Sequence, residues 1–256
     1  MFDLTGKVAI VTGGNGGLGR AMAQGLAEAG ANIVIAARSA DKNAKAAEEV
    51  QALGVKALPV KADVTLEEDV RAMVRQAMEV FGRVDILVNN VGVLYRKQPE
   101  ELSLEEWNSV LRVNLDSAFL CSREVYPHMK RVGGGKIINI ASTASLFGSD
   151  SAASYSTSKG GMLQLARSLA LAWAKDNIQV NAILPGWFMT EMTADLHKRN
   201  PQRARAITQR IPAGRWGSPL ELRGVVVFLA SPASSYVTGA AIAVDGGYTS
   251  GLRPLS

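Results

Sequence analysis

Short apolar runs alternate with longer stretches of mixed apolar and polar residues along the whole chain. The short runs predict strands at 7–12, 31–37, 55–62, 84–90, 135–142, 178–185 and 240–246. Several of them are β-branched and apolar at nearly every position, which is typical of strands that a parallel sheet buries on both faces.

The longer stretches have apolar residues at helical spacing. They predict helices at 17–30, 41–53, 67–81, 103–132, 153–175 and 219–230, with 103–132 expected to hold two helices. Regular alternation of strand and helix is typical of right-handed βαβ units. The sequence therefore predicts an α/β fold: a single doubly wound (Rossmann) domain over 1–256, with a parallel seven-stranded sheet and helices on both faces.

One long interval, 185–219, interrupts this alternation. Its apolar residues, such as Trp187, Phe188 and Met189, argue against disorder. Irregular intervals of this length in compact domains are usually functional. We therefore predict that 185–219 is a partly helical lid over a substrate site.

The stretch "VTGGNGGLG" follows the first predicted strand and opens the first predicted helix. At this place a glycine loop presents bare N–H groups to the phosphates of a dinucleotide, although a plain tight turn also uses glycine. Two motif registers fit: Gly14 and Gly16, or Gly13 and Gly17, each completed by Gly19. The loop alone does not decide between them.

Polar or glycine-rich segments also follow the other predicted strands. They are Asp63, Asn89 to Gly92, Ser142, and Pro185 with Gly186. The carboxyl ends of parallel strands meet at one edge of the sheet, where ligands bind in doubly wound folds. These segments are therefore expected to line a common crevice.

Two tyrosine–lysine pairs have the spacing that places both side chains on one face of a helix. Tyr155 and Lys159 are preceded by Ser142, thirteen residues before the tyrosine at the end of a predicted strand. Tyr126 and Lys130 have no such serine. We interpret the second pair as incidental and the first as candidate chemistry.

Together these motifs resemble the short-chain dehydrogenase/reductase family over essentially the whole chain. The matching residues are Thr12, Gly13, Gly17, Gly19, Asp63, Asn89 to Gly92, Asn114, Ser142, Tyr155, Lys159, Pro185, Gly186 and Thr190. The family pattern selects the register of Gly13, Gly17 and Gly19. One departure is Val91, where that pattern has alanine.

The resemblance implies hydride transfer between a nicotinamide cofactor and a secondary alcohol or ketone. Tyr155 would exchange the proton, Ser142 would orient the substrate oxygen, and Asn114 would hold a water that relays protons to Lys159. A free tyrosine has a pKa near 10, so an efficient base needs that pKa lowered. We expect the Lys159 ammonium and the cofactor ring to lower it by about three units, or roughly 4 kcal/mol.

The resemblance also implies a set of cofactor-binding positions. They are Thr12, Gly13, Asn15, Gly17, Leu18, Gly19, Arg38, Asp63, Val64, Asn90, Val91, Gly92, Tyr155, Lys159, Pro185, Gly186 and Thr190. The second strand ends at Ala37 and Arg38, without the carboxylate that an NAD site uses for the ribose hydroxyls. Arg38 can bind a 2′-phosphate, so NADP(H) is favoured and NAD(H) stays open.

Substrate contacts are expected from the loops around the cofactor, at Leu94, Ser142, Ala144, Tyr155 and Trp187. Nearby cations such as Arg96 could bind a carboxylate, although exposed cations are more often solvated surface. The stretches "IPAGRWGSPLEL" and "VVVFLASPASSYVTGAAIAVDGGY" resemble the gluconate and deoxygluconate dehydrogenase branch, which implies a sugar acid or polyol substrate. The alternatives are a 3-oxoacyl-thioester reductase, a reductase of cyclic ketones or steroids, and a non-catalytic dinucleotide-sensing regulator.

Composition narrows the remaining classes. The net charge of +5 comes from 28 basic and 23 acidic residues that are scattered along the chain, so neither a nucleic-acid partner nor a membrane partner is expected. Cys121 is the one cysteine, and the two histidines have no metal-ligand spacing, so no metal is expected. We expect a cytoplasmic protein, and the family resemblance implies a homotetramer built on apolar helices.

Overall fold

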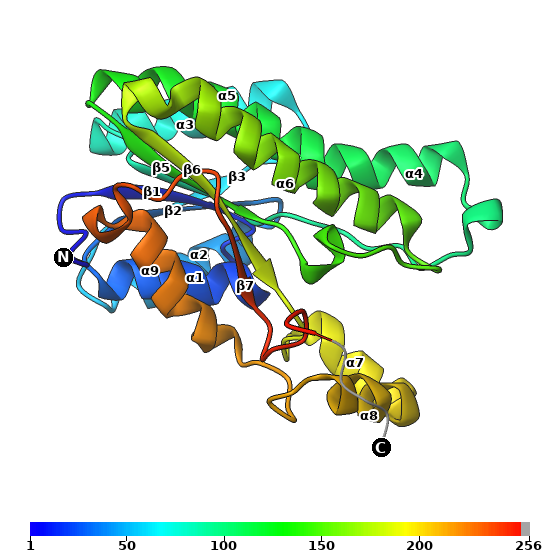
Figure 1. Ribbon diagram of the computed structural model, residues 1–256. Helices are drawn as coiled ribbons and strands as arrows, with labels where there is room; N and C mark the ends of the chain where they lie inside the picture. Colours follow the sequence, from blue (N-terminus) through cyan, green and yellow to red (C-terminus); the bar gives the residue numbers. More distant parts are fainter. Residues whose placement is uncertain (252–256) are drawn as a thin grey trace.

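The structure, a computed structural model, describes residues 1–251 apart from the side chains of Met192 and His197 (Figure 1). Its strands are β1 Val8–Thr12, β2 Asn32–Ala37, β3 Ala57–Lys61, β4 Ile86–Asn89, β5 Gly135–Ile140, β6 Ile178–Pro185 and β7 Ala241–Val244. They form a seven-stranded sheet in the order β3-β2-β1-β4-β5-β6-β7, in which every neighbouring pair is parallel. The predicted α/β sheet is confirmed.

Helices cover both faces of the sheet. They are α1 Gly17–Glu28, α2 Ala40–Gln51, α3 Glu67–Phe81, α4 Leu104–Leu111, α5 Ser117–Arg131, α6 Ala153–Trp173, α7 Glu191–Arg199, α8 Pro201–Arg210 and α9 Arg223–Ala230. In Figure 1, α3, α5 and α6 lie on one face of the sheet, and α1, α2 and α9 lie on the other. Strand order reverses between β1 and β4, so the ligand crevice of the fold opens at their carboxyl ends.

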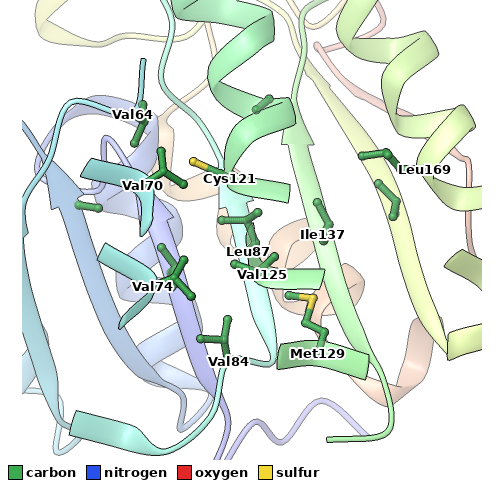
Figure 2. Close-up of a cluster of buried hydrophobic side chains, with 14 of the residues drawn as sticks. Val64, Val70, Val74, Val84, Leu87, Cys121, Val125, Met129, Ile137 and Leu169 are labelled. Carbon is green, nitrogen blue, oxygen red and sulfur yellow. The ribbon is translucent and has the colours of Figure 1, made fainter. Parts of the chain in front are cut away.

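Each layer of helices closes over its own apolar core. On the first face, Cys121, Val125 and Met129 of α5 point toward Leu87 of β4 and Ile137 of β5 (Figure 2). Burial raises the pKa of the Cys121 thiol to about 12, so this cysteine is an inert core side chain. Because the two cores hold the strands on both sides, the strand ends are fixed supports for functional side chains.

The two helices predicted within 103–132 are confirmed as α4 and α5, although no loop separates them. A π-helical turn, Arg112–Asp116, joins α4 directly to α5. The wider turn contains Asn114, which is fully buried and hydrogen-bonded to the chain on both sides of it. Single π-turns of this kind often occur at functional sites, where they place one side chain at the expense of regular helix.

The interval 185–219 contains α7 and α8, which extend beyond the carboxyl edge of the sheet (Figure 1). The Trp216 indole N–H donates to the Thr208 hydroxyl at 3.0 Å, which fastens α8 to the chain that follows it. A bridge between Phe188 and Gly217 closes the interval at its base. The assignment of this interval as a lid on a single domain stays a prediction.

Within residues 1–251, every helix is too short or too polar to cross a bilayer.

Candidate active site

A cleft of about 1090 Å³ opens at the carboxyl edge of the sheet. Ligand sites commonly span roughly 300–1,000 Å³, so this cleft is large enough for an extended ligand. The predicted site residues that line it are Gly13, Asn15, Gly17, Leu18, Arg38, Asp63, Val64, Asn90, Val91, Gly92, Leu94, Ser142, Ala144, Tyr155, Lys159, Pro185, Gly186, Trp187 and Thr190. Thr12, Gly19 and Asn114 do not line it.

The glycine loop has three positions at which only glycine fits. Gly13 and Gly17 have left-handed backbones, with φ of +65° and +50°. A Cβ on Gly19 would collide with the carbonyl oxygen of Gly13. Gly16, by contrast, has open space around it. The structure thus requires the register of Gly13, Gly17 and Gly19.

This loop fits the pyrophosphate of a dinucleotide. It lies along the cleft directly before α1, and Gly16, the residue that precedes the helix, provides no side-chain cap. The first N–H groups of α1 are therefore available to an anion, and the helix dipole favours negative charge there. A side chain on Gly13 or Gly17 would strain this cradle.

Thr12 and Gly19 support the loop from behind instead of lining the cleft. The Thr12 hydroxyl donates to the Val88 carbonyl at 3.2 Å and accepts from the Asn90 N–H at 3.0 Å. The Asn90 side-chain amide in turn donates to the Thr12 carbonyl at 3.0 Å. These bonds join β1 to β4 at the point where the strand order reverses.

A basic group surrounds the end of β2. Arg38 lines the cleft together with Ser39 and Lys42, which our sequence analysis did not select. Lys42 lies in the first turn of α2, four residues after Arg38, so its nearness in sequence to the end of β2 could have indicated it. All three side chains can donate hydrogen bonds to a phosphate, and two are cations.

Asn43, which our sequence analysis also did not select, connects the ends of β2 and β3 to the glycine loop. Its side-chain amide donates to the carbonyls of Ala37 and Val60, both at 2.8 Å. Its oxygen accepts from the Asn15 amide of the glycine loop at 2.6 Å. The ends of β2 and β3 are thus tied to the loop through one buried side chain.

Tyr155 and Ser142 come together at the centre of the cleft, from the first turn of α6 and the segment after β5. Ser142 is close enough to the Tyr155 hydroxyl to lower the pKa of that tyrosine as a hydrogen-bond partner. The Ser142 hydroxyl also accepts from the Ala144 N–H at 3.1 Å, which leaves its own proton for the tyrosine oxygen. A substrate oxygen at this point could contact both hydroxyl groups.

Lys159 and Asn114 lie beneath this pair. The Lys159 ammonium donates to the Ile140 carbonyl at 2.7 Å and lies 5.8 Å from the centroid of the Tyr155 ring. The Asn114 amide donates to the Val93 carbonyl at 3.0 Å. A Cβ on Gly92 would lie 3.3 Å from the Lys159 ammonium and 3.4 Å from the Asn114 oxygen, so glycine keeps both polar groups accessible to each other.

The pKa of Tyr155 differs from our expectation. Burial raises it, and this effect outweighs the Ser142 hydrogen bond and the charge of Arg96, which both act to lower it. Burial also lowers the pKa of Lys159 to about 8, and the ammonium is hydrogen-bonded to a carbonyl. In the protein alone, desolvation therefore dominates, and the cation that favours the phenolate is Arg96.

A dinucleotide cradle beside a half-buried tyrosine and serine and a buried lysine defines a cofactor-dependent oxidoreductase. A family model described as Enoyl-(Acyl carrier protein) reductase matches residues 13–249. The chain belongs to the short-chain dehydrogenase/reductase family, as its motifs indicated.

Relatives whose names describe a reaction match nearly the whole length of this chain. The 2-dehydro-3-deoxy-D-gluconate 5-dehydrogenase of Escherichia coli K12 is 46% identical over 96% of this chain and 97% of its own. The 5-keto-D-gluconate 5-reductase of the same organism is 40% identical, with the same coverage. A gluconate 5-dehydrogenase from Burkholderia cenocepacia J2315, solved with NADP and tartrate, is 39% identical with a TM-score of 0.94 over 98% of each chain.

Proposed function

We propose that the protein transfers a hydride between NADP(H) and a secondary alcohol or ketone of a sugar acid. The observation that carries this proposal is the charge of Arg96, which acts on Tyr155 in the cleft that Ser142 also lines. A guanidinium beside the proton donor suits a substrate that bears a carboxylate. The names of the sugar-acid relatives support the same substrate class.

The cofactor, when bound, supplies or accepts the hydride. In reduction, Tyr155 donates its proton to the carbonyl oxygen of the substrate while Ser142 donates a hydrogen bond to the same oxygen. The raised pKa keeps Tyr155 protonated at neutral pH, which suits this direction. In oxidation Tyr155 must first lose its proton, so the rate should increase as the pH rises toward its pKa.

For the cofactor, we propose that Arg38, Ser39 and Lys42 bind the 2′-phosphate. Arg38→Ala is expected to raise the KM for NADPH by about tenfold or more, the value of a lost charge-assisted bond, and to change the KM for NADH little. Lys45→Ala, an exposed cation of α2 outside the cleft, is the matched control. Equal effects of Arg38→Ala on both cofactors would favour the NAD(H) alternative.

We also propose a cytoplasmic homotetramer. Phe119 of α5 and Leu171 of α6 point apolar surface outward, with 42% and 85% of their area exposed. Outward apolar side chains on two long helices favour burial against a second copy. Sedimentation velocity should then give about four times the 27.2 kDa of the chain, and a Leu171→Glu variant should sediment as a smaller species.

The test of the reaction is the absorbance of reduced nicotinamide with sugar acids, acyl thioesters and cyclic ketones or their alcohols. Each substrate is run with both cofactors, and Tyr155→Phe serves as the blank. We expect turnover with sugar acids that the variant lacks. Turnover confined to thioesters or cyclic ketones would replace the substrate class, whereas cofactor binding with no turnover would favour a dinucleotide-sensing regulator.

A further inference from the structure

Helix α8 presents one face to the cleft. Arg203, Ile207 and Arg210 all line it, and their spacing places them along one side of the helix. Asn200 caps the helix by accepting the Arg203 N–H at 3.0 Å, and Ala204 is buried behind. The orientation of this face is therefore set by the packing of α8, which makes Arg203 part of the cleft wall.

Arg96 lies in the loop that connects β4 to α4 and lines the same cleft. Burial lowers the pKa of Arg96, and the positive charge of Arg203 lowers it further. Tyr155 and Asp150 act in the opposite direction. The two guanidinium groups are thus within electrostatic reach of each other, and Arg96 is within electrostatic reach of Tyr155.

The two arginines differ from many others in the protein because their charges are not matched. Several surface arginines form close ion pairs with glutamates: Arg20 with Glu49, Arg71 with Glu67, Arg215 with Glu221, and Arg223 with Glu28. Neither Arg96 nor Arg203 forms a salt bridge with a carboxylate of residues 1–251. Asp150 lines the same cleft and acts on Arg96, but it forms no close ion pair with it. Two like charges that face one cleft without a close ion-pair partner are suited to bind an anion.

We propose that Arg203 of α8 and Arg96 of the β4–α4 loop together bind the carboxylate of the substrate. This inference rests on the proposed function and adds the residue that lets the enzyme select sugar acids over neutral polyols. A carboxylate between the two guanidinium groups replaces their repulsion with two charge-assisted contacts. A neutral substrate leaves the repulsion in place, so it also disfavours the position of α8 over the site.

The phosphates of the cofactor are a second possible source of the anion. The glycine loop and the group of Arg38, Ser39 and Lys42 already offer donors for those phosphates at the other end of the cleft. Arg96 instead interacts with Tyr155 and with Arg203, and all three residues line the cleft. We therefore assign them to the substrate, and the KM for NADPH distinguishes the two sources.

The experiment compares Arg203→Gln with Arg205→Gln, a cation of the same helix that does not line the cleft. The substrates are whichever of D-gluconate and 2-dehydro-3-deoxy-D-gluconate the wild type oxidises faster, and the primary amide of that acid. We expect Arg203→Gln to raise the KM for the acid by roughly 10- to 100-fold, the range for a lost contact to a charged group. The wild-type preference for acid over amide should fall by a similar factor. Arg205→Gln should stay within about twofold of wild type.

Three results would overturn this assignment. Equal losses on acid and amide in Arg203→Gln would mean that Arg203 only supports α8. A raised KM for NADPH with an unchanged KM for the acid would move the subsite to the cofactor. An unchanged variant would remove Arg203 from binding altogether. If the wild type oxidises no sugar acid, the proposed function itself fails, whereas the three results above leave that function intact.

Discussion

Two tyrosine–lysine pairs with identical spacing have opposite surroundings in this protein. Tyr155 and Lys159 of α6 lie in the cleft, and Lys159 is only 3% exposed. Tyr126 and Lys130 of α5 lie outside the cleft, and the Lys130 side chain is 54% exposed. Spacing on a helix therefore places two side chains on one face without deciding what they do.

The difference between the pairs is their counterion. The Tyr126 hydroxyl donates to one oxygen of Asp176 at 2.9 Å, and the Lys130 ammonium binds the other at 3.0 Å. Hydrogen bonds to Asp176 and Tyr126 raise the pKa of Lys130, whereas burial lowers that of Lys159. The Asp176 carboxylate makes Tyr126 and Lys130 part of a structural cluster. Lys159 forms no ion pair with a carboxylate of residues 1–251, which leaves Tyr155 and Lys159 available for proton transfer.

Removing the hydroxyl group from each tyrosine in turn is expected to give the largest difference in kcat between the two pairs. Tyr155→Phe is expected to reduce kcat by about 10³-fold or more, because a positioned general acid contributes up to roughly 10⁴-fold. Tyr126→Phe should keep kcat within about twofold and only weaken the contact to Asp176. Steady-state kinetics give both values, and circular dichroism checks that both variants fold. A large loss of kcat in a well-folded Tyr126→Phe would show that the two pairs are functionally linked.

Ser142→Ala should make the Tyr155 pair more like its counterpart, which has Val113 at the corresponding distance. The loss of one donor to the reacting oxygen is expected to reduce kcat by about 10²-fold. Since the Ser142 hydrogen bond lowers the pKa of Tyr155, its removal should raise that pKa. The rising limb of the pH profile for oxidation should therefore move to higher pH.

Ser109→Ala is the control for this prediction, because the Ser109 hydroxyl donates to the Glu106 carbonyl within α4 and Ser109 does not line the cleft. It should leave both the rate and the pH profile unchanged. A Ser142→Ala profile that keeps its wild-type position would mean that the serine does not influence the proton on Tyr155.

Local patterns were sufficient to predict the elements of the sheet. All seven strands lie within their predicted ranges, because burial on both faces produces apolar runs that are visible in the sequence. The order of the strands could not be predicted from local patterns, because strand pairing depends on contacts between distant segments. The π-turn was missed for the same reason: Asn114 is stabilised there by Val93 and Ser158, which lie far along the chain.

The site residues also fall into two groups: those that local sequence patterns predict, and those that depend on contacts between distant segments. Ser142, Tyr155 and Lys159 could be selected because their spacing and their positions at element ends carry the signal. Arg96 gave no such signal, since an exposed arginine after a strand is usually solvated surface. Its significance depends on Arg203, which reaches the same cleft from a helix more than a hundred residues later. Pairings across a cleft are visible only in three dimensions.

Lys159 and Lys130 are expected to have opposite effects on the free energy of unfolding at neutral pH. Unfolded Lys159 keeps its proton up to the ordinary pKa of 10.5, whereas the folded chain releases it at about 8. Between these values the unfolded state binds more protons, so this group makes the wild type more stable as the pH rises, by about 3 kcal/mol in total. Lys159→Met should therefore be stabilised relative to wild type at pH 7, and this advantage should shrink above pH 8.

Lys130→Met should show the reverse dependence. The pKa of Lys130 is raised in the folded state, so its ion pair with Asp176 stabilises the protein at neutral pH and is lost as the pH rises through that pKa. Lys130→Met should be less stable than wild type at pH 7 and approach it at high pH. Urea unfolding of both variants from pH 7 to about 12 measures these slopes, because the contribution of Lys130 changes only above its ordinary pKa of 10.5. Slopes of the same sign would mean that the surroundings of the two lysines do not differ in the way that burial and Asp176 predict.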